Sequence, residues 1–112
     1  MLLPDPYPKH RPQRSAKTKI VVAGDSVGDT RAEVLAAHLG TCKGVEVSHQ
    51  SQSPSGSAEY YANIADRVCQ EILAGKFDRG ILCCGTGIGM AMSANKVPGI
   101  RAAQTHDTFS AE

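Results

Sequence analysis

Short apolar runs alternate along the chain with longer segments in which apolar residues recur every three or four positions. The first pattern is typical of buried strands and the second of amphipathic helices. The predicted strands span residues 19–23, 45–47, 80–84 and 100–104. The predicted helices run from a cap at Asp29 or Thr30 to Gly40, from a cap at Ser57 to Gly75, from a glycine turn to Asn95, and onward from about Thr108. This alternation predicts an α/β fold, a Rossmann-like parallel sheet with helices on both faces in three layers.

The two ends of the chain depart from this pattern. Residues 1–18 contain four of the six prolines and several basic side chains, and their apolar residues do not recur at a regular spacing. This predicts a flexible N-terminal tail at 1–18, followed by a domain at 19–112. At the other end, the sequence stops at Glu112 in what should be the first turns of a helix, so we expect a fold truncated at the C-terminus.

Candidate chemistry is concentrated where the run Gly80-Ile-Leu-Cys-Cys84 opens into three alternating glycines. Such glycines let backbone N–H groups converge on one point, and the helix that follows adds its N-terminus, so the turn is suited to bind an anion. Cys84 lies at the C-terminal end of the strand, where α/β sheets bind ligands, and is a candidate base beside an oxyanion site. Its neighbour Cys83 must face the other way and is better interpreted as a core residue, and a disulfide between the two is a remote alternative.

A second turn, after the first predicted strand, emerges at the same edge of a parallel sheet. It carries Asp25 and Ser26, which we expect to approach Cys84 and form a pocket. Asp25 can orient a hydroxyl group there or simply cap the next helix, and Ser26 has the same two interpretations. Thr86, in the glycine turn, is a candidate catalytic residue beside Cys84 that would hydrogen-bond a substrate oxygen, and the alternative is that it only stabilises the turn.

Nucleotide motifs are incomplete. A dinucleotide fingerprint needs glycine where this chain has Met90, and no Lys-Ser or Lys-Thr pair follows the turn, so only a weak nucleotide-binding alternative through Asp107 remains. Asn95 and Arg101 flank the following helix, and Arg101 is a candidate phosphate ligand if it faces the pocket.

The composition of the chain argues against several classes of partner and site. The chain has 12 Lys and Arg against 11 Asp and Glu, so its net charge does not favour binding to nucleic acid or to an anionic membrane. The four cysteines lack paired spacing and the histidines are scattered, which argues against a zinc site, and no apolar run approaches the length of a membrane span. Free thiols without an export signal predict a cytoplasmic protein, and 112 residues are few for such a fold, so a partner subunit is expected.

The segments Gly80-Ile-Leu-Cys-Cys-Gly-Thr-Gly-Ile-Gly89, Ser93-Ala-Asn-Lys96 and Gly99-Ile-Arg-Ala102 resemble the type B ribose-5-phosphate isomerases and the related galactose-6-phosphate and allose-6-phosphate isomerases. The resemblance extends from Lys19 to the end and includes His106-Asp-Thr-Phe-Ser-Ala111. It implies a metal-free, cofactor-free aldose–ketose isomerase, a homodimer or tetramer with active sites between subunits. The substrate favoured is ribose 5-phosphate, converted to ribulose 5-phosphate.

The resemblance also implies residue roles. Cys84 would be the base that moves a proton between C1 and C2 of the sugar, and the backbone of the turn would stabilise the enediolate through Gly85, Gly87, Ile88 and Gly89. Asp25, Ser26 and Tyr61 would contribute to substrate binding, although the family commonly has histidine at the position of Ser26. The family's His-Asn pair and phosphate-binding arginines lie beyond Glu112, and His106 does not match that histidine. A catalytically impaired sugar-phosphate-binding or assembly subunit is therefore the alternative.

Overall fold

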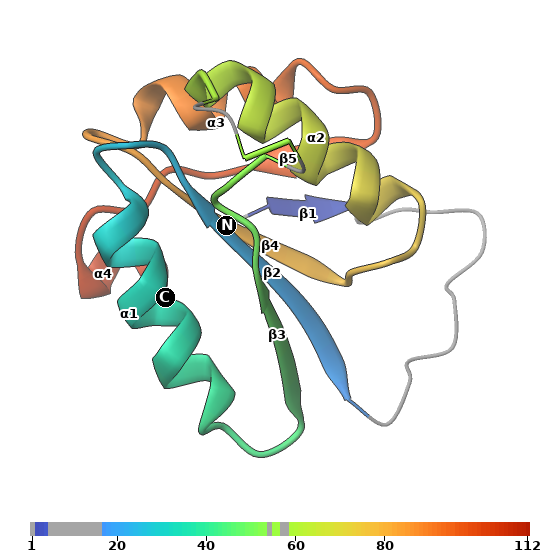
Figure 1. Cartoon of the computed structure of the whole chain (residues 1–112), viewed down its shortest axis with the longest axis vertical. Helices are drawn as coiled ribbons and strands as arrows, with labels where there is room; N and C mark the ends of the chain where they lie inside the picture. The colour runs from blue at the N-terminus through green and yellow to red at the C-terminus, as the bar shows by residue number, and fades with distance from the viewer. Residues whose placement is uncertain (1, 5–16, 54, 57–58) are drawn as a thin grey trace.

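The computed structural model describes residues 2–4, 17–53, 55–56 and 59–112. In chain order the elements are β1 (Leu2–Pro4), β2 (Thr18–Gly24), α1 (Asp29–Gly40), β3 (Val45–His49), α2 (Tyr61–Leu73), β4 (Arg79–Cys83), α3 (Ile88–Asn95), β5 (Ile100–Ala102) and α4 (Thr108–Ala111) (Figure 1). The strands form one sheet in the order β3-β2-β4-β1-β5.

The central strands confirm the predicted parallel arrangement. β2 pairs in parallel with β3 on one side and with β4 on the other. Helix α1 covers one face of the sheet, and α2 and α3 cover the other (Figure 1). The result is the expected three-layer architecture, in which the carboxyl ends of β2 and β4 lie side by side.

One part of the predicted tail belongs to the sheet. Leu2–Pro4 forms β1, which lies between β4 and β5 and runs antiparallel to both. Leu2 is 2% exposed, and a Cβ placed on the facing Gly80 would lie 3.2 Å from the Leu2 Cβ. The prediction of a tail is therefore wrong for these residues, because burial of Leu2 against a side-chain-free position outweighs the nearby prolines. Residues 5–16 of the predicted tail lie outside the described part of the chain.

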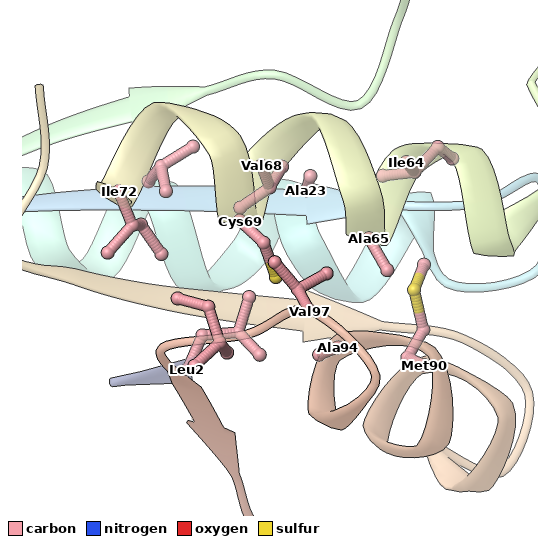
Figure 2. Close-up of a cluster of buried hydrophobic side chains, with 12 residues drawn as sticks. Leu2, Ala23, Ile64, Ala65, Val68, Cys69, Ile72, Met90, Ala94 and Val97 are labelled. Atoms are coloured by element: carbon pink, nitrogen blue, oxygen red, sulfur yellow. The ribbon is translucent and has the colours of Figure 1, made fainter. Parts of the chain in front are cut away.

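The core has two halves that follow the alternation of side chains along β2. Val21 and Ala23 face α2 and α3 and join a cluster that includes Ile64, Val68 and Met90 (Figure 2). Ile20 and Val22 face α1. Each fully buried Val, Ile or Met contributes roughly 1.5–3 kcal/mol through removal of apolar surface from water, so β2, buried on both faces, anchors the fold.

Several predicted boundaries shift by a few residues. Helix α1 is capped by Gly28 without a side-chain hydrogen bond, so neither Asp29 nor Thr30 is its cap. Helix α2 begins at Tyr61 with Tyr60 as its N-cap, whereas the expected cap, Ser57, lies outside the described residues. β5 ends at Ala102, two residues before Gln104, because the chain leaves the sheet to contact the glycine turn.

Candidate active site

The turns after β2 and β4 are in direct contact. Gly24 pairs with Cys83 at the ends of the two strands, and the next residue, Asp25, donates its backbone N–H to the carbonyl oxygen of Cys83 at 3.2 Å. Gly28 packs so closely that an added Cβ would lie 2.2 Å from the same oxygen. The predicted convergence of these two turns is confirmed, and it depends on glycine at position 28.

Cys84 is the first residue after β4 and is half-buried. Its Sγ accepts a hydrogen bond from the backbone N–H of Gly87 at 3.0 Å. Gly87 has φ of 81°, a left-handed conformation that glycine adopts without strain, and it is the N-cap of α3. The sulfur of Cys84 therefore accepts a backbone amide N–H at the N-terminus of α3.

Cys83 has a different environment. It is 6% exposed and packs with Ile20, Val22 and α1, as predicted for a core residue. Burial raises the pKa of its thiol, so Cys83 stays neutral. All four cysteines are free, and the remote alternative of a disulfide between positions 83 and 84 is therefore wrong. Adjacent cysteines are thus divided between the core and the turn.

The glycine turn is held by two further contacts around Thr86. The Thr86 Oγ1 accepts the backbone N–H of Ile88 at 3.2 Å, which is the turn-stabilising alternative for this side chain. The Thr86 carbonyl oxygen accepts the side-chain Nε2 of Gln104 at 2.8 Å. Gln104 was not among the predicted site residues. A polar side chain just past a short apolar run gives little indication of its partner in the sequence alone.

On the opposite turn, Asp25 organises its own backbone. One carboxylate oxygen, Oδ1, accepts the N–H groups of Val27 at 3.0 Å and Gly28 at 2.8 Å. The Asp25 side chain therefore stabilises the turn after β2. It does not cap α1, whose N-cap is Gly28 without a side-chain hydrogen bond. Ser26 is exposed on the same turn.

Tyr61, the first residue of α2, packs on the start of α3. A Cβ on Gly89 would lie 2.7 Å from the Tyr61 Cε2, so this contact requires glycine. The Tyr60 and Tyr61 rings lie 4.5 Å apart. The pKa of Tyr61 is raised, mainly by a hydrogen bond with Tyr60 and by the charge of Tyr60. Burial and the charge of Cys84 raise it further, to a smaller extent. Tyr61 is thus brought to the same end of the sheet as Cys84.

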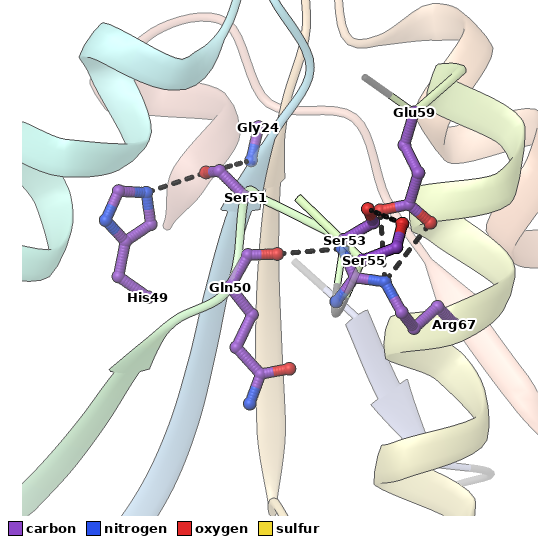
Figure 3. Close-up of polar contacts among 8 residues, drawn as sticks. All are labelled: Gly24, His49, Gln50, Ser51, Ser53, Ser55, Glu59 and Arg67. Atoms are coloured by element: carbon purple, nitrogen blue, oxygen red, sulfur yellow. Dashed lines mark hydrogen bonds and ion pairs between the residues drawn. The ribbon is translucent and has the colours of Figure 1, made fainter. Parts of the chain in front are cut away.

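A polar cleft of about 420 Å³ opens beside this end of the sheet, over the loop after β3. Sequence reasoning assigned no chemistry to that loop. Several side chains around this cleft contact one another (Figure 3). His49 Nε2 lies 2.6 Å from Ser51 Oγ, and the same oxygen accepts the backbone N–H of Gly24. Arg67 forms an ion pair with Glu59 at 2.7 Å. A hydrogen bond from Ser51, and less strongly His49, lowers the pKa of Asp29 at the rim.

The remaining candidates lie elsewhere. Asn95 joins α3 to β5 through two 2.8 Å hydrogen bonds with the backbone of Ala102, so its function is structural. His106 is exposed, and Asp107 caps α4 through the N–H of Ser110. Within the described residues, no group of three or more His, Cys, Asp or Glu side chains is arranged to hold a metal ion. Over the same residues, no helix has the length and apolarity needed to cross a membrane.

Comparison with known proteins places this arrangement in a family. The family model described as Ribose/Galactose Isomerase matches residues 20–112. The chain is 44% identical over 93 residues to D-erythrulose-4-phosphate isomerase of Pectobacterium atrosepticum, covering 83% of this chain and 60% of that protein. It is also 44% identical over 94 residues to ribose-5-P isomerase B of Listeria innocua, covering 84% of this chain and 62% of that protein.

Solved structures give the same result for the fold. The type B ribose 5-phosphate isomerase of Trypanosoma brucei superposes with a TM-score of 0.74 at 33% identity, over 85% of this chain and 64% of that one. The chain thus spans less than two thirds of the length of these relatives. With the family model matching nearly all of the chain from β2 onward, the chain belongs to the ribose/galactose isomerase family.

Proposed function

We propose that this protein interconverts an aldose phosphate and a ketose phosphate through a cis-enediolate, with Cys84 as the base. The observation that carries the proposal is the 3.0 Å hydrogen bond from the Gly87 amide to the Cys84 sulfur, at the N-terminus of α3. A neutral thiol is a weak base, so the proposal requires Cys84 to react as its thiolate, with the N–H of Gly87 as the hydrogen-bond donor to the sulfur. Cys83, buried and neutral, does not compete for the role.

The isomerisation moves one proton from C2 to C1 and a second proton from the C2 hydroxyl group to O1. The Cys84 thiolate removes the proton from C2 of the open-chain aldose, and the C1 carbonyl oxygen becomes the enediolate oxyanion. The thiol then returns a proton to C1 while the proton of the C2 hydroxyl group moves to O1. This leaves a carbonyl group at C2 and a hydroxyl group at C1, and Cys84 is again a thiolate. The backbone amides of the glycine turn stabilise the intermediate charge.

The hydrogen bonds of the turn indicate which amides are free to stabilise the oxyanion. The N–H of Gly87 bonds the thiol, and the N–H of Ile88 bonds Thr86 Oγ1. Either amide would have to exchange partners to bind a sugar oxygen. We therefore assign the oxyanion to the amides of Gly85 and Gly89, and Gly87 to the thiolate.

Asp25, Ser26, Thr86 and Tyr61 complete the proposed substrate site. Asp25 shapes the facing turn through its bonds to Val27 and Gly28, and Ser26 presents a hydroxyl group there. Tyr61 lies over Gly89 at the start of α3. Among possible substrates we favour ribose 5-phosphate and ribulose 5-phosphate, and the relative from P. atrosepticum makes D-erythrulose 4-phosphate the first competitor.

A homo-oligomer is also part of the proposal. Ile88 and Met92 lie one turn apart on α3 and are 51% and 63% exposed, an apolar strip next to the site that a second copy would cover. Light scattering should give the mass of a dimer or tetramer. A cytoplasmic location is proposed on the four free thiols.

The experiment that tests the activity is conversion of each sugar phosphate by the purified chain in deuterated water, followed by proton NMR. Formation of ribulose 5-phosphate from ribose 5-phosphate, with loss of the C2 proton signal from recovered aldose, supports the enediolate isomerase. If a folded sample binds the sugar phosphate in calorimetry but converts neither substrate, the protein is instead the binding subunit. One observation favours the binding subunit. The Oδ1 of Asp25 already accepts the N–H groups of Val27 and Gly28, so this oxygen is occupied within its own turn.

A further inference from the structure

Gln104 and Cys84 hold opposite ends of one peptide unit. The carbonyl oxygen of Thr86 accepts the Gln104 Nε2 at 2.8 Å, and the N–H of Gly87, in the same peptide unit, donates to the Cys84 Sγ at 3.0 Å. In a trans peptide these two groups point in opposite directions. The side chain of Gln104 therefore lies on one side of the Thr86–Gly87 peptide and the sulfur on the other.

This peptide unit has an alternative orientation. Rotating it by about half a turn changes ψ of Thr86 and φ of Gly87, and glycine accepts φ of either sign. The rotated peptide would direct its carbonyl oxygen toward Cys84 in place of the N–H. A thiolate would then face a carbonyl dipole of the wrong sign and lose its hydrogen-bond donor.

Gln104 is placed to prevent that rotation. It lies two residues beyond the end of β5 and lines, together with Gly87, a cavity of about 70 Å³. Its Cγ would lie 3.3 Å from a Cβ on Gly87, so the stem of the side chain packs against the turn while the amide reaches the carbonyl oxygen. This hydrogen bond joins the segment after β5 to the glycine turn.

We propose that Gln104 is a positioning residue that fixes the Thr86–Gly87 peptide with its N–H on Cys84, and thereby favours the thiolate. The inference rests on the proposed function only for its effect on turnover, since the effect on the thiol can be measured without a substrate. Polarisation through the peptide adds to the orientation, because a donor on the carbonyl oxygen strengthens the N–H as a donor.

The test compares Gln104→Met with the wild type. Methionine preserves the length of the side chain and its contact with Gly87 but has no N–H. Gln104→Glu, which replaces the donor with an acceptor of the same shape, is the second variant. Gln70→Met is the matched control, because Gln70 is an exposed glutamine on α2 whose amide contacts Asp66. Thermal unfolding verifies that each variant is folded.

The main measurement is the rate of alkylation of Cys84 by iodoacetamide as a function of pH, with the modified residue located by mass spectrometry. We expect the midpoint of the profile to rise by about half a pH unit or more in Gln104→Met and Gln104→Glu, which makes alkylation at neutral pH about threefold slower. The Gln70→Met profile should match the wild type. Unchanged profiles in both Gln104 variants overturn the proposal.

Turnover separates this inference from the proposed function. If the wild type isomerises a sugar phosphate, kcat of Gln104→Met should fall about threefold with little change in KM, since the thiolate acts in the chemical step. A shifted alkylation profile in a protein that converts no sugar phosphate supports the positioning of Cys84 and contradicts the isomerase. An active wild type with unshifted variant profiles contradicts the positioning alone.

Discussion

The backbone N–H of Gly87 lies 3.0 Å from the sulfur of Cys84, and so connects the end of the central strand β4 to the first turn of α3. This contact brings a thiol, a left-handed glycine and a helix N-terminus together at one edge of the sheet. The facing turn after β2 is held against it by Gly28.

Gly28→Ala should destabilise the protein by at least about 2 kcal/mol, because the new Cβ would lie 2.2 Å from the Cys83 carbonyl oxygen, a backbone atom that cannot move aside easily. Gly40→Ala is the control. Its nearest neighbour would be a Val47 methyl group at 3.7 Å, and its stability should remain within about 1 kcal/mol of the wild type. Urea unfolding measures both, and equal stability of the two variants would show that the two turns do not touch.

Cys69 should make stability depend on pH in the alkaline range. The side chain is fully buried, and burial raises its pKa from 9.0 to about 11. Unfolded chains then lose the thiol proton at lower pH than folded ones, so stability is fully present below pH 9.0 and falls as pH rises toward 11. The loss attributable to this residue should approach about 3 kcal/mol once the pH exceeds 11, and about half of that at the pH midway between the two pKa values.

The measurement is urea unfolding of the wild type and of Cys69→Ala near neutral pH and again midway between the two pKa values. The variant begins less stable because it leaves a small cavity, but it should lose less stability at the higher pH. An equal alkaline loss in the two proteins would contradict the assignment to Cys69. Tyrosines and the other thiols contribute equally to both proteins and cancel in the comparison.

Asn95→Ala should remove both hydrogen bonds to the Ala102 backbone and cost about 1–2 kcal/mol. Asn63→Ala, at an exposed position of α2, should change stability by less than about 0.5 kcal/mol. Thermal unfolding of the two variants provides the comparison. A loss no greater for Asn95→Ala than for Asn63→Ala would mean that the link between α3 and β5 contributes nothing.

The sequence predicted the central part of the fold well because the signals there are strong and local. The β-branched run before Gly24 and the apolar run before Cys84 each fill a strand that is covered on both faces. Their parallel pairing is enough to predict that the two turns lie together. The division of Cys83 and Cys84 between core and turn followed from side-chain alternation alone.

What the sequence missed depends on contacts between distant segments. Three residues, Leu2–Pro4, are too short to show an alternating pattern, and their place in the sheet depends on the space above Gly80. Gln104 could be recognised only once the end of β5 was seen beside the glycine turn. The hydrogen bond between His49 and Asp29 likewise joins residues 20 positions apart on the chain, and no local pattern indicates it.

The most direct test of the central claim is the exchange of the C2 proton of ribose 5-phosphate in deuterated water, compared between the wild type, Cys84→Ala and Cys42→Ala. Cys42 is a half-buried cysteine at the far end of α1, so its replacement controls for loss of a thiol. We expect exchange and conversion in the wild type and in Cys42→Ala. In folded Cys84→Ala, the rate of C2 proton exchange should be lower by a factor of about 100 or more. Full exchange in Cys84→Ala would contradict the account.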